Sequence, residues 1–263
     1  MRTIGFRHVF VMVILLLTCT CPVEGQPHRE DEAATVEKML HDFIEEYRGL
    51  GTDTCVYVVQ LDIRPEGQSW HLMVHPEGKI NLAAGPNDQA AFILATDMRT
   101  LLDIYDGKMT AYTAAAQATG LDTVPLQVQT TEVAVALGNP RQALLGFIQD
   151  FFNRSWPERI QLGEEHSRLV HGARAIPLYY GPGFRSGWYK VTKGQSLNEP
   201  GDTNPFPQAF IIISGDGMAK IGDSTIPIRA GESVYIPPGS DHVVWTESDD
   251  GVTLIWIAWG EGA

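Results

Sequence analysis

Cysteine is scarce in this sequence. Only three occur in 263 residues, and two of them, Cys19 and Cys21, lie near the N-terminus. The third, Cys55, would be left without a partner if the first 25 residues were removed, so we expect packing rather than disulfides to stabilise the fold. Cys55 opens the apolar stretch 55–59, which predicts a buried and inert thiol.

Positive charge is scarce too. The chain has 19 Lys and Arg residues against 32 Asp and Glu residues, a formal net charge of −13. A surface with this excess repels nucleic-acid phosphates and anionic membranes, and no basic patch in the sequence offsets it. The composition therefore excludes nucleic-acid binding.

The N-terminal apolar run is short. It covers residues 9–17, whereas a helix that spans a bilayer needs roughly 20 apolar residues. Basic residues precede the run and small polar residues follow it, which is the order of a secretory signal peptide. We therefore predict a signal peptide over 1–25, no membrane span, and a secreted or periplasmic protein. Lipoprotein anchoring through Cys19 or Cys21 is the alternative.

A helix, four strands and further helices are predicted between residues 26 and 155. Polar residues predict a loose lead-in over 26–34, and apolar positions at helical spacing predict a helix over 35–47. Extended segments bounded by turn residues are predicted at 55–63, 69–75, 79–83 and 89–96. Helices are predicted at 98–105 with Asp97 as N-cap, at 111–118 and at 140–152.

Residues 96–115 resemble a motif of the sterol carrier protein 2 (SCP2) family. The motif is a short helix, the turn Asp106-Gly107-Lys108, and a second helix that opens with the small and aromatic pair Ala111-Tyr112. The resemblance covers residues 34–155. It implies an α+β domain in which a sheet and its covering helices enclose a tunnel for fatty acyl chains, sterols or other apolar ligands.

The alanine-rich helix has a physical consequence of its own. Small side chains at Ala111, Ala114 and Ala115 leave space against the sheet, and we predict that they line a ligand pocket. Close packing of helix on sheet, without a cavity, is the alternative interpretation.

The character of the sequence changes after this region. Residues 156–174 are polar and predict a linker with room for one short helix or strand, in which His166 and His171 are exposed. From residue 175 to 263, short strands separated by Gly/Pro turns predict an all-β domain.

One motif in the all-β region is specific. The segment 231–242 has the spacing Gly-x5-Pro-x-Gly-x2-His, which resembles the second motif of the cupin superfamily. There the histidine, here His242, ligates a metal inside a small jelly-roll barrel. The resemblance implies a cupin barrel over 175–263, and a homodimer through this domain because cupins often pair their sheets.

The first cupin motif is depleted. Its pattern is His-x-His, three or four residues, Glu, six residues, then Gly. Counting back from Gly215 puts Gln208 at the glutamate position and Asp202 and Asn204 at the histidine positions, or Gly201 and Thr203 in the longer spacing. Asp202, Asn204, Gln208 and His242 would suit only weakly bound Mn²⁺ or Mg²⁺. A metal-free barrel, with no cofactor, is the leading interpretation.

Side-chain alternation places a second set of residues inside the barrel. Residues at i and i+2 of a strand share a face, so Phe210 and Ile212 should point inward with Gln208, and Val244 with His242. We predict a small-molecule pocket lined by Phe210, Ile212 and Val244. If the domain is an enzyme, His242 and Asp202 are the expected acid–base pair.

These observations predict an α+β SCP2-like domain followed by an all-β cupin jelly-roll barrel. The leading functional hypothesis is an exported binding protein for an apolar or amphipathic small molecule, such as a sterol or fatty acyl compound, with a degenerate metal site in the cupin module. The alternative is a cupin enzyme of the lyase, isomerase or oxygenase class that acts on a hydrophobic substrate, with His242 as metal ligand or acid–base group.

Overall fold

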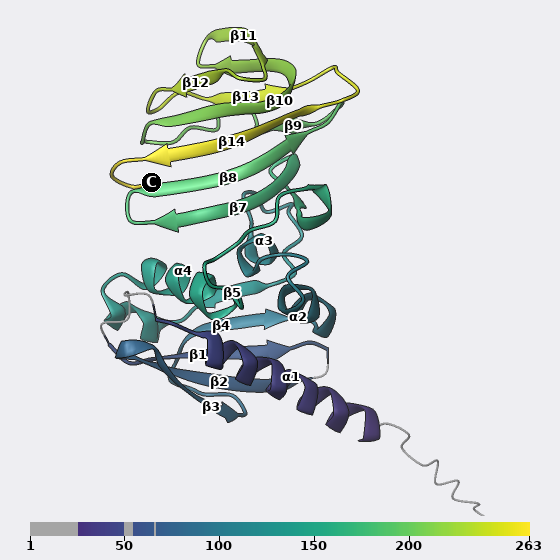
Figure 1. Ribbon diagram of the computed structural model, residues 1–263. Coiled ribbons are helices and arrows are strands. Elements are labelled where there is room, and N and C mark those ends of the chain that lie inside the picture. The colour runs from purple at the N-terminus through teal and green to yellow at the C-terminus, as the bar shows by residue number, and fades with distance from the viewer. Residues whose placement is uncertain (1–25, 50–54, 66) are drawn as a thin grey trace, which may run out of the picture.

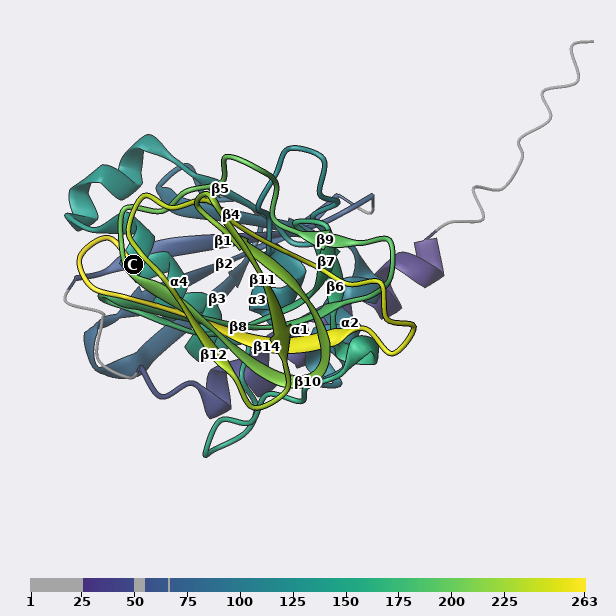
Figure 2. The same cartoon turned by 90° about the horizontal axis from the view of Figure 1, so that it is seen from above.

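A computed structural model describes residues 26–49, 55–65 and 67–263. The predicted signal peptide, with Cys19 and Cys21, lies outside the described residues. The chain forms an N-terminal α/β layer and a C-terminal β layer stacked on it, and α3 and α4 lie between the two sheets (Figure 1). Seen from above, the C-terminal strands lie over the N-terminal sheet (Figure 2).

The N-terminal sheet has the strand order β3-β2-β1-β4-β5. Strands β1, β2 and β3 are successive antiparallel neighbours, and β4 crosses over to run parallel to β1. The elements of this layer are α1 (Gln26–Glu46), β1 (Tyr57–Ile63), β2 (Gln68–His75), β3 (Lys79–Ala84), β4 (Ala90–Thr96), α2 (Met98–Tyr105), α3 (Ala111–Ala115), β5 (Gln127–Thr130) and α4 (Pro140–Phe151), with short 3-10 helices at Pro76–Gly78 and Glu132–Leu137.

Most predicted elements of this layer are confirmed within two residues. Asp97 caps α2 as predicted, since its Oδ1 accepts a hydrogen bond of 2.7 Å from the Thr100 amide. The predicted lead-in was wrong, because α1 begins at Gln26. Pro27 fits in a first helical turn, where its missing N–H has no partner to lose, and Ala33 and Ala34 are strong helix formers.

Helix α3 is shorter than the predicted 111–118. Ala116 has an extended backbone, with φ −61° and ψ 127°, and ends the helix. The guanidinium of Arg168 binds this end of the helix, because its Nη1 donates to the oxygens of Thr113, Ala114 and Ala116 at 2.6, 3.0 and 3.2 Å. A cation from the C-terminal layer thus caps the end of a helix of the N-terminal layer.

Cys55 was predicted to be buried, and this is wrong. The thiol is exposed, as is the neighbouring Val56 at 51%. The apolar stretch enters the sheet only at Tyr57, two residues later, so Cys55 precedes the strand that would have covered it.

The C-terminal layer is a curled nine-stranded sheet. Its long strand β10 pairs with β12 and β14 in its first half and with β11 and β13 in its second, with a register shift between Ile212 and Ser214. The strands are β6 (Arg168–Val170), β7 (Ala173–Gly181), β8 (Phe184–Val191), β9 (Ser196–Leu197), β10 (Gln208–Ile221), β11 (Ser224–Arg229), β12 (Ser233–Ile236), β13 (His242–Trp245) and β14 (Val252–Trp259).

The predicted linker contains more structure than one short segment. It holds the 3-10 helix Glu164–His166, strand β6 and the start of β7, so the C-terminal sheet begins at Arg168 rather than after residue 174. In the part of the chain that the structure describes, no helix is both long and apolar enough to cross a membrane.

Candidate functional site

His242 is an interior histidine. It opens β13, is 3% exposed, and its Nδ1 lies 3.3 Å from the carbonyl oxygen of Ser240. Burial lowers the pKa of this imidazole, although the Ser240 carbonyl and the Asp202 carboxylate act against the shift. His242 is therefore held neutral inside the sheet at neutral pH.

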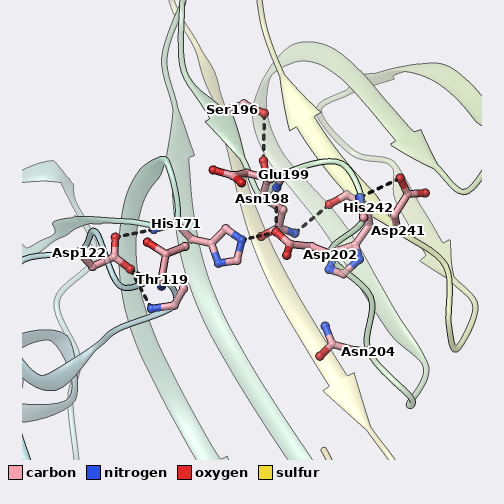
Figure 3. A network of polar contacts seen from close by, with 12 residues as sticks. Thr119, Asp122, His171, Ser196, Asn198, Glu199, Asp202, Asn204, Asp241 and His242 are labelled. Carbon is pink, nitrogen blue, oxygen red and sulfur yellow. Dashed lines mark hydrogen bonds and ion pairs between the residues drawn. The ribbon is translucent and has the colours of Figure 1, made fainter.

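Asp202 faces two donors (Figure 3). Its Oδ2 lies 2.6 Å from His171 Nε2 and accepts a hydrogen bond of 2.8 Å from the Glu199 amide. Burial acts to raise the pKa of the Asp202 carboxyl, but these two hydrogen bonds outweigh it and leave the pKa below its ordinary value. The direct partner of Asp202 is thus His171, and His242 interacts with it only through charge.

His171 was predicted to be exposed in the linker, and this is wrong, since its side chain is 20% exposed. It lies with Gly172 in the two-residue turn between β6 and β7, where both residues have positive φ, 57° and 82°. Its amide also donates to Oδ1 of Asp122, at 3.3 Å, in the N-terminal layer. A residue-Gly pair between two extended stretches is a hairpin signal that could have placed His171 in the sheet.

The amides of Asn204 and Gln208 bind each other rather than forming an open donor set. Gln208 is fully buried, and its Oε1 accepts hydrogen bonds from Trp256 Nε1 at 2.8 Å and Asn204 Nδ2 at 3.2 Å. Both donors compete for the oxygen lone pairs that a metal would need. Among the described residues, no group of three His, Cys, Asp or Glu side chains could hold a metal ion. In this arrangement two donors already occupy the Gln208 carbonyl oxygen. Metal binding by Asp202, Asn204, Gln208 and His242 stays a prediction.

Phe210, Ile212 and Val244 are at most 1% exposed and belong to one core cluster of the C-terminal sheet. They are part of the packed interior of that cluster, and none of them lines the cavities described below. Their predicted role as a ligand pocket stays a prediction.

A cavity of about 350 Å³ lies between the two layers, and we call it the junction cavity. Helices α3 and α4 form one wall and strands β6, β7 and β8 the other, because both helices pack against β7. Its lining is mostly aliphatic and aromatic: Tyr112, Ala115, Ala116, Gln117, Ala118, Val128, Arg141, Leu144, Leu145, Ile148, Val170, Ala175, Pro177, Tyr180 and Tyr189.

Three tyrosines give the junction cavity its polar groups. The Tyr112 hydroxyl donates to the carbonyl of Leu145 at 2.6 Å, and its ring lies 5.5 Å from that of Tyr180. Burial raises the pKa of all three phenols, so they stay protonated donors. The hydroxyls of Tyr180 and Tyr189 make no hydrogen bond to another described residue, although both side chains line the cavity.

The three alanines predicted to line one pocket do not share a cavity. Ala115 lines the junction cavity, whereas Ala114 is fully buried and lines neither cavity. Ala111 borders a separate hollow of about 440 Å³ beside the segment 153–166. Ala111 and Ala115 thus border two different hollows, and the tunnel predicted inside the N-terminal layer stays a prediction.

The polar groups of the larger hollow already bind one another. Arg154 lies 3.9 Å over the ring of Tyr105 and donates to its carbonyl at 3.1 Å. His166 Nδ1 lies 2.7 Å from the carbonyl of Lys108, and Gln149 donates to Glu158 at 3.0 Å. These contacts tie the segment 153–166 to the N-terminal layer, so we take the junction cavity as the candidate binding site.

Comparison with known proteins gives a family for the C-terminal layer. A family model described as a cupin domain matches residues 187–258, and no curated protein matches the chain. A Cupin 2 conserved barrel domain protein from Salinispora arenicola is 28% identical over 39% of this chain and 88% of its own, with a TM-score of 0.35. An RmlC-like cupin from Shewanella frigidimarina is 18% identical over 39% and 90%, with a TM-score of 0.33.

The family model does not reach residues 34–155, so the resemblance of that region to sterol carrier protein 2 stays a prediction. In the C-terminal layer, the match covers the strands from β8 to β14. Residues 187–258 form a cupin domain with a curled jelly-roll β fold.

Proposed function

We propose that the protein binds an apolar or amphipathic small molecule in the junction cavity. The observation that carries this proposal is the cavity itself: about 350 Å³ of space with aliphatic and aromatic walls. Its Tyr180 and Tyr189 hydroxyls make no hydrogen bond to another residue that the structure describes. Concave, mostly apolar sites with a few polar groups are where proteins bind small molecules. The signal-peptide pattern supports a role outside the cytoplasm.

The size of the cavity sets the size of the ligand. At ~30 Å³ for each water-sized group, about 350 Å³ holds roughly a dozen such groups. Each methylene removed from water contributes about 0.8 kcal/mol, so a chain of eight to ten carbons gains roughly 6–8 kcal/mol before the cost of association. A medium-length aliphatic chain is therefore sufficient for measurable binding.

Binding of a small neutral apolar fluorophore, 1-aminonaphthalene, to the delipidated protein tests the proposal, because its size is close to the roughly dozen groups that the cavity holds. We expect saturable fluorescence enhancement in the native protein that 1-decanol reverses by competition. The variant Ala115→Trp should lose it, because an indole at this position fills the cavity. Leu121→Trp is the matched control, since Leu121 is 93% exposed and lies outside the cavity.

A second filling variant, Leu144→Trp on α4, guards against misfolding of the first, and circular dichroism checks both. Equal dye binding in the native protein and in both folded filling variants would refute the junction cavity as the site. Native mass spectrometry of the protein as purified would show directly whether a small molecule accompanies it.

A second candidate function is acid–base catalysis in the cupin domain. One observation favours it: Asp202 lies 2.6 Å from His171 and within electrostatic range of His242. An Asp202→Asn variant tests this role. If it retains full turnover of every substrate that the native protein converts, the carboxylate has no catalytic role.

A further inference from the structure

The junction cavity adjoins a second hollow at the edge of the molecule, which we call the mouth. The mouth has a volume of about 300 Å³ and shares Arg141, Leu145 and Tyr180 with the junction cavity. Its own lining adds Arg185 from β8 and the residues around the start of α4, including Asn139 and Gln142. The two hollows are therefore neighbours across these three side chains, with the apolar hollow on one side and the more polar one on the other.

The mouth carries positive charge without a negative partner. Arg141 and Arg185 both line it, and none of the ion pairs among the described residues involves either of them. No Asp or Glu lines the mouth or the junction cavity. The side chains that line the mouth therefore carry positive charge only, in a chain whose net charge is −13.

Two contacts position Arg185 at the mouth, whereas Arg141 is exposed there. Arg185 donates from Nη2 to the carbonyl of Gly262 at 2.8 Å and lies 5.2 Å over the ring of Phe206. Burial lowers the pKa of Arg185, and the nearby charge of Arg141 lowers it further. Arg141 is the second residue of α4, whose positive dipole end adds to the same potential. An anion placed here would relieve the repulsion between the two guanidiniums.

We propose that the ligand is an amphipathic carboxylate whose head binds Arg141 and Arg185 at the mouth while its aliphatic chain occupies the junction cavity. This inference rests on the proposed function and names its ligand class. Guanidinium groups bind carboxylates through paired, charge-assisted hydrogen bonds. Tyr180 lines both hollows and offers a further donor at the point where head and chain meet.

The size of the interior fits such a ligand. Decanoate has about a dozen non-hydrogen atoms, which matches the roughly dozen water-sized groups that about 350 Å³ can hold at ~30 Å³ each. Its neutral counterpart, 1-decanol, has the same carbon chain without the charge. The pair therefore separates the contribution of the mouth from that of the cavity.

Competition of decanoate and 1-decanol against bound 1-aminonaphthalene tests the inference at pH 8 and low salt. We expect decanoate to bind the native protein about tenfold tighter than 1-decanol, as charge-assisted hydrogen bonds allow. Arg141→Gln and the double variant with Arg185→Gln should reduce decanoate affinity by about tenfold or more while 1-decanol affinity stays unchanged. Arg229→Gln is the control, because that side chain is 72% exposed on β11.

The outcomes separate the two proposals. If 1-decanol binds and Ala115→Trp abolishes its binding, but decanoate has no advantage or the arginine variants leave that advantage intact, the binding function stands and the carboxylate inference is refuted. If neither compound displaces the dye from the native protein, both proposals are refuted.

Discussion

Replacing Arg168 with methionine removes the cation that links the two layers at the end of α3. In the native protein its Nη1 serves three carbonyl oxygens, those of Thr113, Ala114 and Ala116, at 2.6 to 3.2 Å. Burial lowers the pKa of this half-buried arginine, which shows that the contacts lie away from bulk water. Methionine keeps the apolar stem and loses every one of these hydrogen bonds.

The expected loss follows from the chemistry of these bonds. A hydrogen bond to a charged group contributes about 1.5–3 kcal/mol, and one nitrogen shared among three acceptors counts as one to two such bonds, so we expect about 3 kcal/mol. For a chain of this size, 1 kcal/mol shifts Tm by about 2–4 °C, which predicts a decrease of about 6–12 °C. Because α3 borders the junction cavity, ligand affinity should fall as well.

Thermal unfolding followed by circular dichroism measures this effect. The control is Arg174→Met, a neighbouring arginine on β7 that faces Leu169 across the β6–β7 pair. If Arg168→Met and Arg174→Met lower Tm by the same amount, the capping of α3 by Arg168 contributes nothing specific and the argument is wrong.

Three further predictions concern the C-terminal layer. Burial lowers the pKa of His242 below its ordinary 6.5. At acid pH the His242 imidazole therefore binds a proton more readily in the unfolded chain than in the folded chain. The free energy of unfolding should therefore decrease as the pH falls from 7 to 5. Urea titrations should show a smaller decrease in stability for His242→Gln than for the native protein. Equal decreases would contradict the burial argument. Gly172→Ala should destabilise the fold by more than Gly194→Ala. Both glycines have φ near +81°, so the backbone strain of an added side chain is the same at both. A Cβ at Gly172 would also lie 2.1 Å from the backbone oxygen of Ser196, whereas a Cβ at Gly194 would meet no atom within 4 Å. Similar Tm values for the two variants would count against this clash. Since Trp256 and Asn204 already bind Gln208, we expect that neither millimolar Mn²⁺ or Mg²⁺ nor a chelator changes Tm. An increase in Tm on adding a metal, absent from the His242→Ala variant, would support the metal hypothesis.

Several features of the fold could be predicted because their signals are local. Asp97 ahead of an apolar stripe predicts a capped helix, and the structure has that cap. Gly/Pro turns bounding β-branched stretches placed β1 to β4 within two residues, whereas β5 and β7 were not predicted. The Gly-x5-Pro-x-Gly-x2-His spacing around His242 identified the cupin domain. In each case the residues that carry the signal are neighbours in the chain, so the spacing alone reports the geometry.

Other features depend on residues far apart in the chain. His171 and Asp202 are 31 residues apart and meet only because β6 and β7 form a hairpin beside the barrel. The Arg168 contacts with α3 span more than 50 residues. A polar segment such as 156–174 gives no periodicity from which a strand or its partner could be inferred, so these contacts could not be predicted.

By itself, the sequence determined most of the helices, the strands β1 to β4, the cupin domain and the lack of histidine and glutamate in its first metal motif. Hydrophobic period, turn residues and motif spacing are properties of short segments. Only the tertiary structure decided where a ligand could bind. The junction cavity needs Tyr112 from α3, Leu144 from α4 and Tyr189 from β8, and its mouth needs Arg141 and Arg185. Their meeting is set by how two layers pack, and packing depends on the shapes of whole surfaces rather than on any stretch of residues.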